Sequence, residues 1–130
     1  MRLTICLTAA VVLSVSSAQA TAHPAHAKAA SFQLDGTSWL YTGKDGAKLR
    51  ESVDANGKYI VQTRAGKHVD HGTAVMKDGK ACFTSAMTKD GQICWTTSPV
   101  SIGHSLHTVS DKGEKLTVTR VAYTPLQMPH

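Results

Sequence analysis

Glycine recurs along this chain at a near-constant interval and limits the length of every segment between. Eight of the ten glycines, from Gly36 to Gly113, form a series with spacings of nine to thirteen residues, and five of these eight follow Asp or Asn. Such pairs tolerate the positive φ angles that tight hairpin turns require. The intervening runs are short and rich in β-branched and aromatic residues, which is typical of strands. The pattern therefore predicts an antiparallel all-β domain.

Eight strands fit between these turns. Every connection is short, so strands that are neighbours in sequence should be neighbours in space. A meander of eight twisted strands tends to close on itself, because closure removes the exposed edges. We expect an eight-stranded antiparallel up-and-down meander that forms a closed or nearly closed barrel, with a flattened β-sandwich as the alternative. The expected strands are Thr37–Thr42, Ala47–Asp54, Lys58–Arg64, His71–Met76, Ala81–Ala86, Ile93–Thr97, Ser105–Val109 and Lys115–Thr124.

The first twenty residues have the features of a secretory signal peptide. A positive start precedes an apolar run from Leu3 to Val15, which is too short to span a membrane. Ala18-Gln19-Ala20 is a typical cleavage signal, and an overlapping one would place cleavage after Ala22. We expect a bacterial protein that is periplasmic or secreted. Its expected parts are a signal peptide over 1–20, a flexible tail over 21–31 and a single barrel domain over 32–130.

Removal of the signal peptide leaves two cysteines, Cys82 and Cys94. An even count in an oxidising compartment predicts one disulfide, with two buried free thiols as the alternative. If the two cysteines face each other across a strand pair, Thr84 pairs with Gln92. A tight turn at Asp90-Gly91 would keep them too far apart. We therefore expect a wide loop or a bulge between these strands.

Charge and motifs exclude several classes of function. The formal net charge is +5, but basic and acidic residues are interleaved, so we expect no nucleic-acid partner. No segment after the signal is apolar enough to predict a membrane span. The chain has no Gly-x-Ser-x-Gly or His-Glu-x-x-His motif. Its only glutamates, Glu51 and Glu114, do not stand in an apolar setting that would raise a carboxyl pKa. We therefore expect no catalytic site.

The ends of the predicted sheet carry a family resemblance. Asp35-Gly36-Thr37-Ser38-Trp39 opens the first strand, and Arg120 lies in the last. This resembles the calycin arrangement of lipocalins and avidins, in which a Gly-x-Trp packs under an arginine from the last strand. The chain departs from that motif by one extra residue between glycine and tryptophan. The resemblance implies that Trp39 and Arg120 close one end of a barrel, where a guanidinium can stack on the indole.

The interior of the predicted barrel separates two functional hypotheses. An open lumen would bind a small ligand, which is the function we expect first. A filled interior would shift function to the loops, as in a protein-interaction or inhibitor module of the cell envelope. The side chains expected to fill the interior are Tyr59, Val61, Val75, Phe83, Trp95, Leu116 and Val118.

Histidines offer a third possibility, the binding of zinc. His68 and Asp70 should share one strand face, with His71 on the other. Together with His104 and His107 they provide the nitrogen and carboxylate ligands that zinc accepts. Nothing in the sequence brings the two segments together, so solvated turn histidines are the alternative.

The predicted tail could bind copper. Cleavage after Ala20 leaves Thr21-Ala22-His23 at the new N-terminus. The free α-amine, two backbone amides and the His23 imidazole form a four-nitrogen square-planar set that suits Cu(II) or Ni(II). Cleavage after Ala22 would abolish this site. We expect no cofactor other than copper or zinc bound by these histidines.

Overall fold

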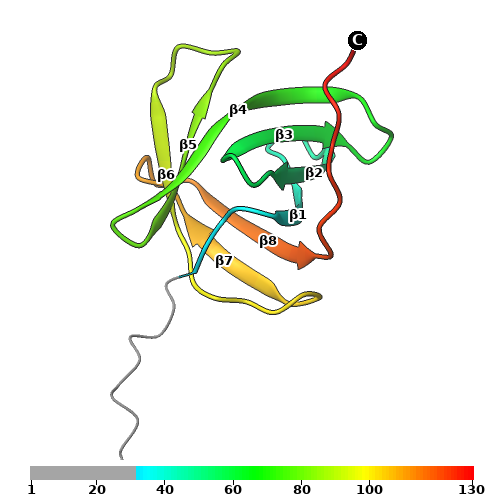
Figure 1. Ribbon diagram of the computed structural model, residues 1–130. Coiled ribbons are helices and arrows are strands. Elements are labelled where there is room, and N and C mark those ends of the chain that lie inside the picture. The colour runs from blue at the N-terminus through cyan, green and yellow to red at the C-terminus, as the bar shows by residue number, and fades with distance from the viewer. Residues whose placement is uncertain (1–31) are drawn as a thin grey trace, which may run out of the picture.

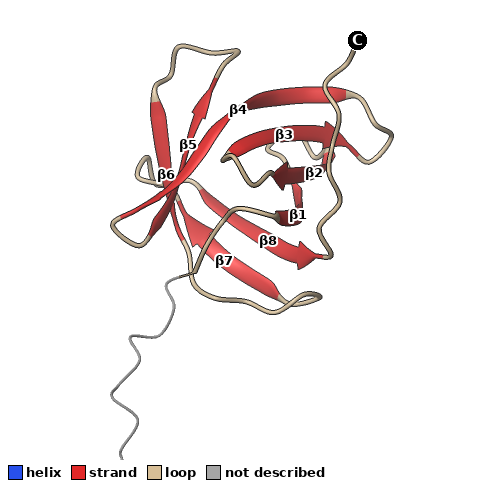
Figure 2. Cartoon of the chain, in the orientation of Figure 1, coloured by secondary structure: helices blue, strands red, loops and turns tan. Residues whose placement is uncertain are grey.

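The computed structural model describes residues 32–130, and all regular structure in this range is antiparallel β-sheet (Figures 1 and 2). The eight strands form one sheet in the order β6-β5-β4-β3-β2-β1-β8-β7. This order confirms the predicted up-and-down meander, since only β1 and β8 pair without being consecutive. The strands are β1 Thr37–Thr42, β2 Lys48–Val53, β3 Lys58–Thr63, β4 His68–Lys77, β5 Lys80–Ser85, β6 Gln92–Thr96, β7 Ser105–Val109 and β8 Lys115–Val121.

The sheet curls into a barrel that is nearly closed, with one unsealed seam between β6 and β7. Along this seam a single bridge joins Trp95 to Ser110. Side chains supply further bonds: the Thr108 hydroxyl donates to the Thr96 carbonyl at 2.6 Å, and the Val109 amide donates to the Thr96 hydroxyl at 3.0 Å. These short polar contacts replace a continuous ladder of backbone hydrogen bonds between β6 and β7. The sheet therefore forms a nearly closed barrel and not the flattened sandwich that was the alternative.

The turns follow the chemistry that the glycine pattern predicts. Asp78 and Gly79 both have positive φ, at 51° and 75°, and Lys77 pairs with Lys80 across them. Positive φ at both central residues defines the type I′ turn, whose twist matches that of the flanking strands. The adjoining strands β4 and β5 therefore form a tight two-residue hairpin.

A β-bulge in β4 decides which side chains face the interior. Val61 of β3 pairs with Asp70, whereas the next residue, Gln62, pairs with His68, so Val69 is an extra residue. A bulge shifts the alternation of side chains by one position. Val69 and Asp70 consequently both line the interior cavity.

The C-terminal segment lies against the outer face of β1 and β2, and Figure 1 shows it crossing the sheet there. The Ser38 and Ser52 hydroxyls lie 2.7 Å apart, and Ser52 donates to the Thr124 carbonyl at 2.6 Å. The Thr124 amide donates back to the Ser38 hydroxyl at 3.0 Å. Both serines are buried by this contact. No helix that could cross a membrane occurs among residues 32–130.

One interior prediction is wrong. Val75 is 52% exposed, because the strand alternation turns its neighbours Ala74 and Met76 toward the core instead. The remaining residues that were expected inside do line the interior cavity: Tyr59, Val61, Phe83, Trp95, Leu116 and Val118.

Candidate functional site: the lumen of the barrel

The lumen holds a cavity of about 360 Å³. Leu34 and Trp39, which lie before and early in β1, line it and are buried. Val69, Thr88 and Asp90 also line it, and all three are exposed, so the cavity reaches the surface at these residues. Most of the wall is apolar. Side chains from six strands and the segment before β1 form it, namely Leu34, Trp39, Val61, Ala81, Phe83, Ile93, Trp95, Leu106, Leu116 and Val118.

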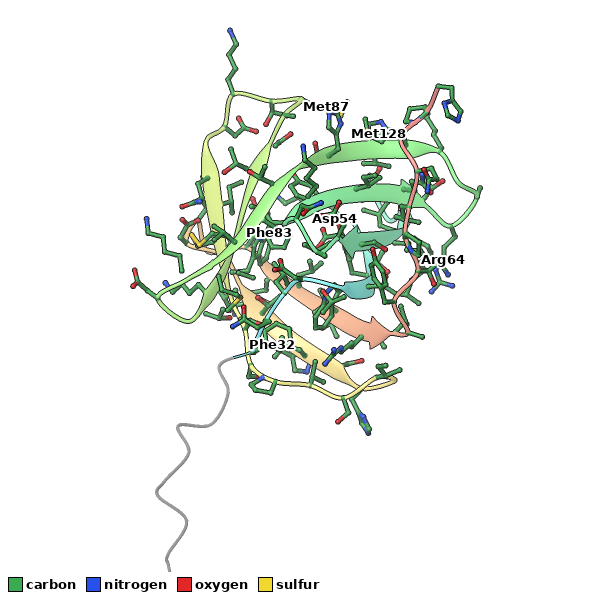
Figure 3. All side chains as sticks on the ribbon, viewed as in Figure 1. Phe32, Asp54, Arg64, Phe83, Met87 and Met128 are labelled. Carbon is green, nitrogen blue, oxygen red and sulfur yellow. A yellow bond between two sulfur atoms is a disulfide. The ribbon has the colours of Figure 1, made fainter. Side chains whose placement is uncertain are left out.

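Phe32 contacts both residues of the predicted barrel closure, Trp39 and Arg120. Trp39 of β1 pairs directly with Arg120 of β8. The Arg120 guanidinium lies over the ring of Phe32, 5.8 Å from its centroid, and Phe32 meets Trp39 edge-on at 6.1 Å. The cation–π contact is thus made with Phe32, which precedes the first strand (Figure 3). Arg120 also donates to the Val100 carbonyl at 2.9 Å. Trp39 and Arg120 are the pair expected from the sequence, whereas no motif pointed to Phe32.

Glu51 lies between apolar neighbours inside the lumen. It pairs with Trp39 on one side and with Val61 on the other, and these two residues are only 5% and 4% exposed. The strand alternation of β2 requires this orientation, because Leu49 and Val53 face inward at the positions two residues away. An acidic residue therefore stands where the pattern calls for an apolar one.

The environment of Glu51 corrects the expectation that neither glutamate is in an apolar setting. Burial is the main cause that raises the pKa of Glu51 from 4.5 to about 7, and the nearby Asp70 charge adds to it. A hydrogen bond from the Tyr41 hydroxyl, at 3.3 Å, acts in the opposite direction. Burial and the Glu51 charge also raise the pKa of Tyr41. Glu51 thus changes charge near neutral pH.

A second polar cluster lies further along the same wall. The Tyr59 hydroxyl donates to one Asp70 oxygen at 2.8 Å, and the Ser85 hydroxyl donates to the other at 2.6 Å. Burial, together with the hydrogen bond to Asp70, raises the pKa of Tyr59, which therefore stays protonated as a donor. Asp70 is held rigidly by two strands, whereas Glu51 has a single long hydrogen bond.

The predicted disulfide is present. Cys82 and Cys94 are directly paired and bonded, and Thr84 pairs with Gln92 as the register required. The connection between them is a wide loop, and Met87 lies exposed within it (Figure 3). Loop residues Thr88, Asp90 and Gly91 line the cavity. The disulfide therefore fixes the two strands that carry the mouth of the lumen.

The predicted histidine set does not assemble. His68 Nε2 and His71 Nδ1 lie 3.2 Å apart, because the bulge at Val69 puts both rings on one face. The expectation that His68 shares a face with Asp70 is therefore wrong. His107 contacts Thr117 at 2.9 Å on β7 and β8, which are not neighbours of β4. Among residues 32–130 no group of three or more His, Cys, Asp or Glu side chains could hold a metal ion.

His104, the remaining predicted zinc ligand, is exposed just before β7, and its backbone pairs with Arg120. The candidate copper site at Thr21, Ala22 and His23 lies outside the described residues, as does the predicted signal peptide. Both stay predictions. The lumen is therefore the site that the described structure offers for function.

The chain matches no known protein family, curated protein or solved structure.

Proposed function

We propose that this chain is a non-enzymatic exported binding protein, a lipocalin-like barrel that holds a small ligand in its lumen. The cavity of about 360 Å³ carries this proposal. Its size lies at the lower end of small-molecule pockets, and apolar side chains supply most of the surface of its wall, as in such pockets. The disulfide supports an exported location, because disulfides persist in oxidising compartments.

The alternatives have less support. An envelope protein-interaction or inhibitor module fits a filled interior better than a lumen that reaches the surface. Copper or zinc binding through histidines would need more ligands than the His68–His71 pair provides. The calycin resemblance, in which Trp39 and Arg120 would close one end, also favours a ligand-binding barrel, and the two residues are paired across β1 and β8.

A neutral fluorescent dye, N-phenyl-1-naphthylamine, tests the proposal on the purified, oxidised chain. Trp39 and Trp95 both line the cavity, so their emission should be transferred to a dye bound inside. We expect one dye per chain. Ile93→Trp should weaken binding about tenfold or more, because it fills the lumen. Val75→Trp is the matched control, since Val75 is exposed on the outer face.

Circular dichroism and a thermal melt establish that both variants fold before their binding is compared. Absence of one-to-one binding to the parent protein would refute the proposed function. So would equal binding by the Ile93→Trp and Val75→Trp variants, because the dye would then bind outside the lumen.

A further inference from the structure

The charged side chains that line the cavity are all acidic. Glu51, Asp70 and Asp90 line it, whereas no Lys, Arg or His among residues 32–130 does so. The contrast is informative because the whole chain carries a net charge of +5. In a site shielded from water, like charges repel and opposite charges attract more strongly than in bulk solvent. The lumen therefore disfavours anions such as fatty acids and favours cations.

The two inner carboxylates differ in how many acceptor positions they have left. Both oxygens of Asp70 already accept a hydrogen bond, one from Tyr59 and one from Ser85. Glu51 accepts one bond of 3.3 Å from Tyr41, and its other oxygen has no protein donor within residues 32–130. A buried carboxylate with an unused oxygen is a strong acceptor for a ligand ammonium group.

The protein provides no cation of its own to Glu51. Arg120 lies in the same cross-strand row, but Trp39 stands between them. The Arg120 guanidinium is directed instead to the Phe32 ring and the Val100 carbonyl. The titratable groups that face Glu51 from the neighbouring strands are Tyr41, Tyr59 and Asp70, and none of them can supply positive charge.

The remaining wall suits an apolar body attached to the cation. Phe83, Ile93, Trp95 and Leu106 line the cavity away from the β2 strand that carries Glu51. Apolar surface buried against these side chains contributes roughly 25 cal/mol per Å². Trp39, the cross-strand neighbour of Glu51, also lines the cavity, and indole rings attract cations.

We propose that the lumen binds a small organic cation, a protonated primary amine on an apolar body, with Glu51 as its counter-ion. This inference depends on the proposed ligand-binding function and names the ligand class. The ammonium donates to the unused Glu51 oxygen, and the apolar chain extends along the wall formed by β5 and β6. Asp90 at the mouth adds negative charge where the ligand arrives.

Three probes of equal chain length test the proposal: decylamine, decanol and decanoate, each displacing N-phenyl-1-naphthylamine at pH 8. Glu51 is ionised at this pH, since its pKa is about 7, and an alkylamine is protonated. A charge-assisted hydrogen bond is worth about 1.5–3 kcal/mol. Decylamine should therefore bind about ten- to a hundredfold more tightly than decanol. Decanoate should bind more weakly than decanol.

Glu51→Gln should lower decylamine affinity about tenfold or more and leave decanol affinity unchanged. Glu114→Gln is the matched control, because Glu114 pairs with Lys44 on the surface at 2.7 Å, and it should change neither affinity. Equal binding of the three probes would overturn the amine proposal while sustaining ligand binding, as would a Glu51→Gln variant that keeps the preference. Failure of the dye and all three probes to bind would refute the proposed function itself.

Discussion

Replacing Glu51 by Gln should stabilise the protein at pH 8 and change little at pH 4. The pKa of Glu51 is raised from 4.5 to about 7, so between these values the folded state holds a proton that the unfolded state has lost. Stability therefore falls as pH rises through this window, and the full cost is present above pH 7. A shift of this size corresponds to roughly 3 kcal/mol.

Gln removes this cost while keeping the shape of the side chain and a carbonyl that can accept from Tyr41. At pH 8 the variant should gain up to about 3 kcal/mol in the free energy of unfolding. This figure is an upper value, because any water that solvates the carboxylate in the lumen lowers the cost of burying it. For a domain of about 100 residues this is up to about 12–24 °C in melting temperature. At pH 4 both side chains are neutral, so the difference should nearly vanish.

Urea unfolding of the oxidised protein at pH 4 and pH 8, followed by tryptophan fluorescence, measures both differences. The Glu114→Gln variant controls for the loss of any glutamate, and its effect should stay within about 0.5 kcal/mol at pH 8, because Glu114 and Lys44 form a surface ion pair. The reasoning would be refuted if Glu51→Gln stabilised the protein equally at both pH values, or destabilised it at pH 8.

Two further predictions concern the disulfide and the contacts of Arg120. The Cys82→Ala/Cys94→Ala double variant should lose roughly 3 kcal/mol, since the disulfide closes a loop of 12 residues, and an unchanged urea midpoint would contradict this. Arg120→Ala should lose about 1–2 kcal/mol through the contacts with Phe32 and the Val100 carbonyl, and Arg120→Lys should restore only part of it. Thermal melts of both Arg120 variants test this, and a neutral Arg120→Ala would show that these guanidinium contacts do not stabilise the fold.

The features that depend on local chemistry were predictable from the sequence. A turn such as Asp78-Gly79 is specified by residues that touch each other along the chain, so the hairpins and hence the meander follow. The cysteine register was predictable for a similar reason. Once the Cys82–Cys94 bond is assumed, the pairing of Thr84 with Gln92 is fixed by geometry.

The features that depend on partners far away in the sequence were not predictable. The bulge at Val69 reverses the faces of the residues before it, so His68 joins His71 while Asp70 turns inward. The sequence has no glycine or other turn residue at Val69 that would predict this bulge. The seam between β6 and β7 also arises from how the whole sheet curls, which individual strands do not specify.

The position of Glu51 in the lumen is indicated by the strand pattern of the sequence. Leu49, Glu51 and Val53 alternate in β2, so the acid occupies a position where the pattern requires an apolar residue. Such a conflict between local pattern and residue type is expected at functional sites more often than elsewhere. If the alternation of inward and outward residues continues across Glu51, the Glu51 side chain must face the lumen, as Leu49 and Val53 face the core.

The energetics of Glu51 argue that the residue serves binding rather than folding. Ionised Glu51 lies between Trp39 and Val61 with one long hydrogen bond, so its burial lowers the stability of the fold at neutral pH. The cost of burying Asp70 is offset by hydrogen bonds from two donors. A residue kept only for the fold would be expected to have its partners in place, as Asp70 does. A cationic ligand would supply the missing partner and lower the pKa of Glu51 toward its ordinary value. Binding would then remove the unfavourable free energy of the unpaired carboxylate, and this free energy would contribute to the affinity. Ionisation of Glu51 would therefore set the pH dependence of both folding and binding.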